Sequence, residues 1–479
     1  MKRKLLIFSI SLGLFLSSCE KMVQVEPKNS VSANVALGTI SGYESLLNSA
    51  YVRFIAFTYY GRDFVLLPDV MSDNLYTELS VANGRYISQN SNQINAHMNL
   101  WTNSYLIINE VNTILDNIDK LTDPRVSQIK AEAYSLRALA YFDLARVYGY
   151  EPVNVATAGA GFDKSVPLRL KSTAVVADAA QSPRATVTEV YKSIEADLRS
   201  AIALFGSGAS ASRYRFNKGA AYGLLGKVYI YSGRWAEAVT ELDNAMSTTN
   251  TGARLAAAGN YVAAFKATPN TESLLEFVIS PTAQLSGVVG GNDSMYSYTH
   301  PNGYNAISTF GGQTASDELF ALFNAGDDRL NMFFKFGGTS ASPAPLFNWV
   351  DKYSAALGVY TDNAKVIRFS DLLLLKAEAL AEQTQYAAAA AIVTQLRANR
   401  NATGVTVPTD INIKEFIQTE RRRELFFEGQ RWFDLKRRAV GISKPAKTGV
   451  ATLAPTDFRL LAPIPNAEVL LGIQKNPGY

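Results

Sequence analysis

The sequence predicts a mainly α-helical protein in which helical hairpins stack into a curved layer, with an irregular, loop-rich subdomain that carries a few short strands. Two observations lead to this prediction. Most of the chain repeats apolar residues at intervals of three and four, as amphipathic helices do. Two long stretches, about 59–95 and 250–365, lack that period and are instead rich in Gly, Asn, Ser and Tyr.

Composition and charge exclude several classes of function. The 479 residues are 47% hydrophobic, which is ample for a core. The formal charge of +4 includes Lys2, Arg3 and Lys4 and is +1 without them, so nothing points to nucleic acid. A single cysteine excludes internal disulfides. The only two histidines, His97 and His300, exclude a histidine-rich metal centre.

The N-terminus reads as an export signal. Residues 1–18 combine a basic start, an apolar run too short to span a bilayer, and small residues before Cys19. Leu16-Ser17-Ser18-Cys19 resembles the lipobox of bacterial lipoproteins, in which the cysteine carries lipid. We therefore expect Cys19 to be a lipid attachment point and residues 19–40 a tether. The alternative is an ordinary signal peptide with an incidental cysteine.

The residues after the tether predict helices around the first irregular stretch. A helical pattern covers Ser41 to Phe57, and residues 59–95 form a candidate recognition surface between helices. A helix from near His97 to Ile118 and a second one up to Tyr148 are joined by a short turn. They should pack as an antiparallel hairpin.

The clearest repeat follows a helix opened by Ser182-Pro183-Arg184. Small and bulky residues fall at the spacing of a tetratricopeptide unit, at Leu225, Gly226, Tyr229, Gly233, Trp235, Ala238, Leu242 and Ala245. A weaker copy lies between Ala377 and Val393. Because one unit cannot bury its apolar face alone, we expect the hairpins to stack into a single domain over residues 41–479.

The second irregular stretch has few regular elements. Leu274 to Ile279 predicts a short strand and Ser316 to Phe323 a helix. A further helix is expected from Val366 to Leu380. More than a hundred irregular residues in a compact protein normally serve binding.

The stretch from Glu415 to Arg438, EFIQTERRRELFFEGQRWFDLKRR, predicts one helix held on several sides. Large apolar residues lie between its charges, so we expect its arginines to reach backbone or carboxylates rather than water. Its role should be structural. Charges three and four apart make ion pairs available at Glu420–Arg423, Glu428–Arg431 and Asp434–Arg438.

Four stretches also resemble a known family. Glu420 to Arg437 match, nearly throughout, the signature E-R-R-x-E-L/F-x-x-E-G-x-R-W/F-x-D-L/F-x-R of the SusD/RagB family of bacterial outer-membrane lipoproteins. The segments AEAYSLRALAYFDLARVYG and VIRFSDLLLLKAEAL resemble two other helices of that family. The tail Asn476-Pro477-Gly478-Tyr479 resembles its closing residues, although the usual asparagine in the preceding turn is absent.

The resemblance implies both fold and function. Such proteins are built on tetratricopeptide-like hairpins and lie on the cell surface as a lid over a SusC-like TonB-dependent transporter. They capture nutrients, usually glycans and sometimes peptides, for the transporter to carry inward. The resemblance therefore implies a lipid-anchored, outer-membrane carbohydrate-binding protein of polysaccharide utilisation, with no catalysis and no cofactor.

The residues themselves also favour binding over catalysis. No nucleophile motif or metal-ligand spacing is present, and an acidic pair such as Asp327 and Asp328 is expected by chance among 42 acidic residues. Sugar binding requires only aromatic side chains for the ring faces and Asn, Asp, Arg or Gln side chains for the sugar hydroxyls. Both irregular stretches supply these residues.

Seven side chains are candidates for ligand binding, each with simple packing as the alternative. Two come from the first irregular stretch, two begin the helix after it, where relatives place a sugar-stacking aromatic residue, and three come from the second stretch. They are Asp73, Arg85, Trp101, Asn103, Tyr296, Tyr304 and Trp349.

Other functions stay open at this point. A helical-repeat structural or assembly lipoprotein would bind no small ligand and would not need residues 280–350. A member of the family could bind peptides rather than glycans. A surface hydrolase has no supporting motif.

Overall fold

The computed structural model of the chain describes residues 37–79, 84–180, 182–206, 212–247, 249, 252–279, 293–336 and 347–479. The expected signal peptide, Cys19 and most of the tether lie outside the described residues. The helices described are α3 (Ile40–Phe54), α4 (Asp63–Val70), α5 (Ile87–Asn90), α6 (Trp101–Asn117), α7 (Val126–Tyr148), α8 (Val187–Leu204), α9 (Lys218–Tyr231), α10 (Trp235–Met246), α11 (Tyr261–Lys266), α13 (Met295–Thr299), α14 (Asp317–Phe320), α15 (Phe369–Glu382), α16 (Tyr386–Ala398), α17 (Ile413–Leu425), α18 (Arg431–Arg437) and α19 (Asn466–Leu470).

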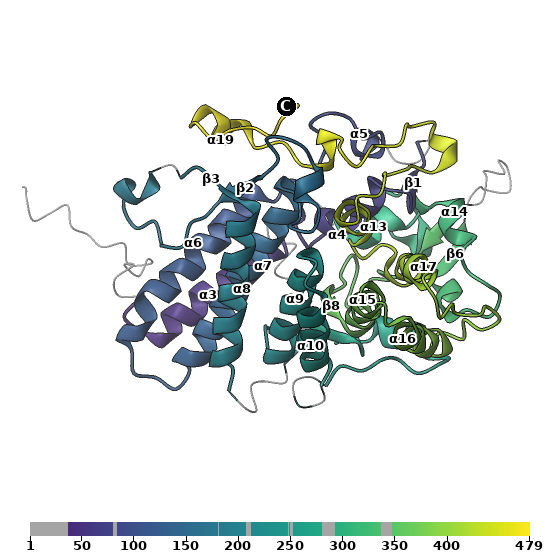
Figure 1. Cartoon of the computed structure of the whole chain (residues 1–479), viewed down its shortest axis with the longest axis horizontal. Helices are drawn as coiled ribbons and strands as arrows, with labels where there is room; N and C mark the ends of the chain where they lie inside the picture. Colours follow the sequence, from purple (N-terminus) through teal and green to yellow (C-terminus); the bar gives the residue numbers. More distant parts are fainter. Residues whose placement is uncertain are drawn as a thin grey trace, which may run out of the picture.

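Two blocks of helices form the scaffold, as Figure 1 shows. In the first block α3 and α6 to α10 pack in chain order, each against its neighbours, and α10 contacts α15 of the second block. The second block, α15 to α17, has an apolar core of its own. The C-terminal segment crosses the top of the view and ends near α19, above β2 and β3. The prediction of a mainly helical fold built on stacked hairpins is confirmed.

Small residues lie where paired helices touch, as the repeat pattern predicts. In the hairpin of α9 and α10, a Cβ atom built on Gly226 would lie 2.7 Å from Cγ of Leu242. In the hairpin of α15 and α16, Ala377 and Ala389 are fully buried. These positions let the helix backbones approach closely, which buries both apolar faces.

The strands bring the irregular stretches together. β1 (Leu75–Thr77), β5 (Gln313–Ala315), β7 (Phe347–Val350) and β6 (Phe333–Phe336) form one antiparallel sheet in that order. Leu75 lies opposite Ala315, so residues 240 positions apart are neighbours. Two further pairs are β2 (Lys164–Pro167) with β3 (Arg184–Thr186), and β4 (Ser273–Phe277) with β8 (Ala364–Arg368). The strand predicted at Leu274 is β4.

The prediction of one helix from Glu415 to Arg438 is wrong. The chain turns sharply between α17 and α18, with Phe427 at φ 60° and Gly429 at φ 74°. A Cβ atom on Gly429 would lie 2.8 Å from the carbonyl oxygen of Phe64, so glycine is needed both for its backbone angle and for this close approach. The turn places α18 against α4.

Two of the three predicted ion pairs do not form, because Glu428 lies in the turn and pairs with Lys352 and Arg368, and Asp434 has other partners. Glu420 and Arg423 pair at 2.9 Å, as predicted. Arg431 instead pairs with Asp73 at 2.8 Å, and Asp434 pairs with Arg421 and Arg437. The arginines of this segment therefore pair with carboxylates of other segments more than with those of their own helix.

Three predicted helix starts also differ from the structure. The helix expected to open at Ser182-Pro183-Arg184 begins only at Val187, because Arg184–Thr186 pairs with β2 as strand β3. The segment beginning at Val366 opens as strand β8, and α15 begins at Phe369, because the edge of β4 offers Val366 and its neighbours backbone partners. The helix expected near His97 begins at Trp101, after four residues without regular structure.

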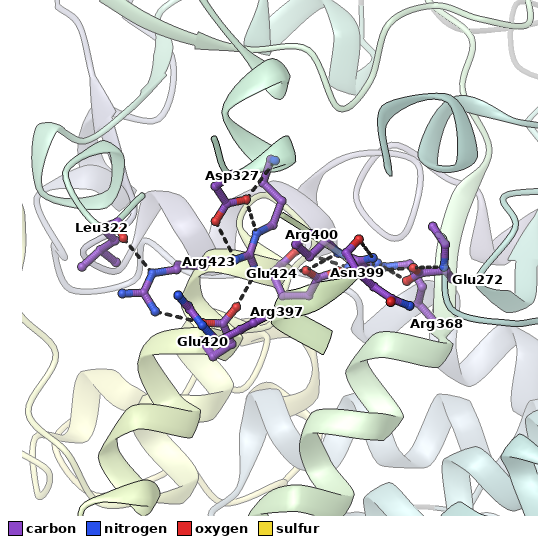
Figure 2. A network of polar contacts seen from close by, with 12 residues as sticks. Glu272, Leu322, Asp327, Arg368, Arg397, Asn399, Arg400, Glu420, Arg423 and Glu424 are labelled. Carbon is purple, nitrogen blue, oxygen red and sulfur yellow. Dashed lines mark hydrogen bonds and ion pairs between the residues drawn. The ribbon is translucent and has the colours of Figure 1, made fainter. Parts of the chain in front are cut away.

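A buried ion-pair network centred on Glu424 joins α17 to four other segments (Figure 2). Glu424 accepts from Arg368 at 2.8 Å, from Arg400 at 2.9 Å and from Arg329 at 3.2 Å. Glu272 bridges Arg368 and Arg400 at 2.7 Å each. Burial alone would raise the pKa of Glu424, but Arg400 and Arg368 hold it well below its ordinary value.

The acidic pair Asp327 and Asp328 belongs to the same region and is structural, as expected. Asp327 is buried and pairs with Arg329 at 2.8 Å. Asp328 accepts from the backbone N–H of Gly259 at 2.7 Å.

Removing the central carboxylate should destabilise the fold strongly. We expect Glu424→Ala to lower the free energy of unfolding by about 3–5 kcal/mol, because three buried arginines lose a shared partner. The matched control on the same helix is Glu415→Ala, whose side chain is 79% exposed and whose pair with Arg438 is 3.7 Å long; its cost should stay below about 0.5 kcal/mol. Urea unfolding measures both. Equal stability of the two variants would contradict the role given to Glu424.

Filling the contact between α9 and α10 should also be costly. Gly226→Ala adds a methyl group against the fully buried Leu242, and we expect a loss of about 1–3 kcal/mol despite the better helix propensity of alanine. Gly206→Ala, where nothing lies within 4 Å, should be neutral or slightly stabilising in the same thermal unfolding assay. A neutral Gly226→Ala would show that the two helices can separate freely.

Candidate functional site

The two irregular stretches meet at α13, which begins where the Ser294 hydroxyl accepts from the backbone N–H of Ser297. Tyr296 and Tyr298 are two positions apart on this helix and therefore face different directions. Each contacts a separate group of aromatic residues. The Arg62 group comprises Phe57, Arg62, Arg85, Tyr86, Tyr298 and Phe310, the His300 group comprises Tyr296, His300, Tyr304, Phe334, Phe336 and Trp349, and the two together are called the loop face.

Arg62 is the centre of the first group. Its guanidinium carbon lies 4.5 Å from the ring centroid of Tyr298 and 5.1 Å from that of Phe57. Its Nε donates to Asp63 at 2.7 Å, and its Nη1 donates to Asp293. Because two carboxylates hold this buried cation, it organises the rings around it. Phe57 is 43% exposed and gives the group an open aromatic surface.

Arg85 extends this group. Its guanidinium carbon lies 3.5 Å from the ring centroid of Phe310, and that ring packs edge-on against Tyr298 with centroids 5.4 Å apart. Arg85 is half-buried, and no ion pair between described residues includes it. Its guanidinium can therefore donate hydrogen bonds to a ligand.

His300 is the centre of the second group. The ring of Tyr296 stacks on it with centroids 4.0 Å apart and planes 16° apart. Tyr304 lies 5.5 Å from His300 and stacks on Phe334 at 4.6 Å. Nε2 of His300 is 3.1 Å from Oδ1 of Asp351. The result is a run of packed rings with half-buried Tyr304 at its outer side.

Four of the seven predicted ligand residues lie in these two groups. Tyr296 and Trp349 are each only 2% exposed. Burial raises the pKa of Tyr296 to about 12, and Nε1 of Trp349 donates to the carbonyl of Phe336 at 2.9 Å. These two side chains hold the outer rings in place, while Arg85 and Tyr304 reach the surface. Direct ligand contact by any of them stays a prediction.

Asp73 has structural partners. Its carboxylate accepts two hydrogen bonds of 2.8 Å from Arg431 and lies 3.3 Å from Arg422. Burial would raise the pKa of Asp73, but the two arginines outweigh it and hold the pKa below its ordinary value. This carboxylate ties α18 and α17 to the segment before β1.

Trp101 and Asn103 lie on different sides of α6. The Asn103 amide donates to the hydroxyl of Thr58 at 3.2 Å, next to Phe57 of the loop face. Trp101 is 3% exposed and packs 5.0 Å from both Tyr105 and Tyr148. It lines a hollow of about 210 Å³ between α6 and the C-terminal segment, away from α13.

The remaining members of the loop face were not among the predicted residues. Tyr298 lies two positions after Tyr296, and Phe334 and Phe336 belong to a run of phenylalanines at strand spacing, so a weak signal existed for these three. Phe57, Arg62, Tyr86, His300 and Phe310 carry no such signal.

The described part of the chain contains no group of three or more His, Cys, Asp or Glu side chains that could hold a metal ion. None of its helices combines the length and the apolar character needed to cross a bilayer.

Comparison with known proteins gives consistent matches. Residues 26–230 match a SusD-like family described as "Starch-binding associating with outer membrane", and residues 337–479 match one described as "SusD family". A SusD-like protein of Formosa agariphila is 26% identical over 96% of each chain.

Solved structures show the same fold. A SusD superfamily protein of Bacteroides thetaiotaomicron superposes with a TM-score of 0.80 at 22% identity, covering 92% of this chain and 100% of that one. A structure described as a laminarin-binding SusD-like protein has a TM-score of 0.73 at 25% identity, covering 92% of this chain and 99% of that one.

The role of Asp73 can be tested through pH. We expect Asp73→Asn to lower the free energy of unfolding by about 1–3 kcal/mol at pH 7, because Arg431 and Arg422 lose a charged partner. Since the pKa of Asp73 is lowered in the folded state, this stabilisation is present above pH 4 or so and is lost as the pH falls through the folded-state pKa. The difference between wild type and variant should therefore shrink towards about pH 3.

Denaturant unfolding at a series of pH values measures this difference. Asp119→Asn is the control, because that carboxylate is 67% exposed in its pair with Lys130 and should show little effect at any pH. A constant difference for Asp73→Asn across the series would refute the ion-pair explanation.

Proposed function

The chain belongs to the SusD/RagB family, and from this we propose that it is a non-catalytic surface lipoprotein that captures oligosaccharides on its loop face and delivers them to a SusC-like TonB-dependent transporter. Its fold is that of SusD-like carbohydrate-binding proteins. Capture on the loop face, delivery and the lipid anchor are the parts that we propose.

One observation carries the proposal: segments far apart in the sequence converge on α13, and there they form the two aromatic groups of the loop face. Phe57 directly precedes the first stretch, Arg85 belongs to it, and Tyr304 and Phe336 belong to the second. An aromatic face suits the C–H side of a sugar ring, and Arg85 can donate to its hydroxyls. Because the rings are packed before a ligand arrives, little ordering entropy is lost on binding.

The same surroundings favour binding without reaction. Asp351, the carboxylate beside His300, is also paired with Lys266 at 2.5 Å. Burial would raise its pKa, but bonds from His300 and Lys266 outweigh burial and lower it, which makes Asp351 a poor general base.

The laminarin-binding relative supports a glycan as the first ligand to test. We propose that the ligand is an oligosaccharide, and we treat peptides as the competing outcome of the same titration.

The lipid anchor follows from Cys19. With lipid on this cysteine, the protein would stay on the membrane without a spanning helix. Expression of Cys19→Ala should therefore shift the protein from the membrane fraction to the soluble fraction. Affinity purification of the wild-type protein from membranes should bring down a barrel transporter.

Removing the ring of Phe57 or of Tyr304, which lie at the outer side of the loop face, should weaken ligand binding. We expect Phe57→Ala and Tyr304→Ala each to lower the affinity for laminarin oligosaccharides by about tenfold, corresponding to the stacking energy of one ring. Isothermal titration measures this, together with a panel of other glycans and of peptides.

The matched control is Tyr386→Ala, a half-buried tyrosine at the start of α16, well away from α13 in Figure 1; it should bind like wild type. If both loop-face variants kept full affinity, the site would lie elsewhere. If only peptides bound, the ligand class would be wrong.

A further inference from the structure

A concave site lies on the other side of α6 from Asn103, which contacts Thr58 next to the loop face. The α6 hollow, about 210 Å³ in volume, opens between α6, the segment after β2 and the C-terminal segment around α19. In Figure 1 α6 and α19 lie to the left and α13 to the right. The side chains that matter for the argument are Tyr105, Ile108, Asn109, Arg169, Glu468 and Ile473, all of which line it.

The hollow has a fixed aromatic wall. Tyr105 is half-buried, its hydroxyl donates to the carbonyl of Pro167 at 2.7 Å, and Trp101 packs behind it at 5.0 Å. Ile108 and Ile473 are buried and complete the apolar part of the lining. The ring of Tyr105 therefore cannot swing away when a ligand enters.

The polar part of the lining contains the cationic side chains of Arg169 and Lys171 and the anionic side chain of Glu468. Nη1 of Arg169 donates to the carbonyl of Ala180 at 2.6 Å and to the hydroxyl of Ser182 at 3.2 Å, which fixes the guanidinium. The Glu468 carboxylate makes no hydrogen bond or ion pair with any other residue that the structure describes. Burial raises the pKa of Tyr105, Glu468 raises it further, and Arg169 lowers it, so both charges act on this hydroxyl.

We infer that the α6 hollow is a second carbohydrate subsite, one that takes a single sugar residue or the end of a chain. This inference rests on the proposed function. At about 30 Å³ per water molecule the hollow holds roughly seven waters, the scale of one sugar ring rather than of an oligomer.

The chemistry of the lining selects a neutral polyol over other ligands. Sugar hydroxyls donate to a carboxylate and accept from a guanidinium at the same time, so Glu468 and Arg169 can both be satisfied. A purely apolar ligand would leave both desolvated and unpaired. An anion would meet Glu468, and a cation would meet Arg169 and Lys171.

Two subsites on one chain have a measurable consequence. A single sugar residue binds weakly, but a polysaccharide that occupies the loop face of one molecule also has further residues at high local concentration near the α6 hollow. Retention by a polymer should therefore exceed what either subsite gives alone.

The test uses native gels cast with laminarin, starch, xylan, mannan or pectin, in which binding slows the protein. Thr173→Trp fills the hollow from its rim, because Thr173 is exposed and lines it. Thr102→Trp, exposed on another side of α6, is the matched control. Glu468→Ala is a second variant of the hollow. The double variant Phe57→Ala/Tyr304→Ala removes the two outer rings of the loop face. Thermal unfolding checks that every variant is folded.

We expect Thr173→Trp and Glu468→Ala each to weaken retention about three- to tenfold, and Thr102→Trp to leave it unchanged. The loop-face double variant should keep a residual retention that Thr173→Trp then abolishes. If Thr173→Trp behaves like Thr102→Trp, or adds nothing to the double variant, the hollow is not a subsite while the proposed function stands. If the hollow variants lose retention and the double variant does not, the hollow is supported and the loop face is refuted. If wild type is retained by none of the five polysaccharides, both proposals fall.

Discussion

The structure depends on the buried carboxylate of Glu424 and the three arginines that share it. Each arginine comes from a different segment: Arg329 lies within the second irregular stretch, Arg368 ends β8, and Arg400 follows α16. None of these charges could be buried alone at acceptable cost, since an unpaired buried ion costs several kcal/mol. They are buried together or not at all. The network therefore fixes the irregular region in one position on the helical scaffold, which is what a site built from loops requires.

The scaffold was largely predictable because its signals are local. Helix spacing, the small residues of the hairpins and the position of β4 all follow from residues within one turn or one strand of each other. The error at Glu415 to Arg438 has a clear physical source. Residues 420–438 have helical charge spacing, but the chain turns at Gly429 and α18 packs against α4. Gly429 approaches the carbonyl oxygen of Phe64, a residue 365 positions earlier in the chain. Only tertiary packing decides which arginine meets which acid.

The candidate site was predictable only in part, for the same reason. Composition predicts that both irregular stretches are candidate binding regions, and it includes Arg85 and Tyr304 among the candidate residues. Sequence alone does not say that Phe57 lies 5.1 Å from the Arg62 guanidinium, or that Tyr298 bridges to Tyr86. The Phe57–Arg62 contact depends on the local chain turn, whereas the contact of Tyr298 with Tyr86 joins two stretches that are also linked by the pairing of β1 with β5. Glu468 and Tyr105, which meet at the α6 hollow, are likewise joined only by the fold.

A protein that hands cargo to a transporter must hold it firmly enough to capture it and loosely enough to release it. The site that we propose on the loop face would meet both needs through rigidity. Arg62 holds Phe57, and the buried Tyr296 and Trp349 lie beneath the group that contains Tyr304. The two outer rings therefore lose little side-chain freedom when a ligand binds. Each open ring contributes only about 0.5–1.5 kcal/mol of stacking, so no single contact traps the ligand. In the proposed mechanism, affinity rises with the number of sugar residues engaged, and it falls again as soon as the proposed transporter competes for part of the chain. A shallow, pre-packed aromatic face on a rigid scaffold is therefore better suited to capture and transfer than a deep pocket that closes around its ligand.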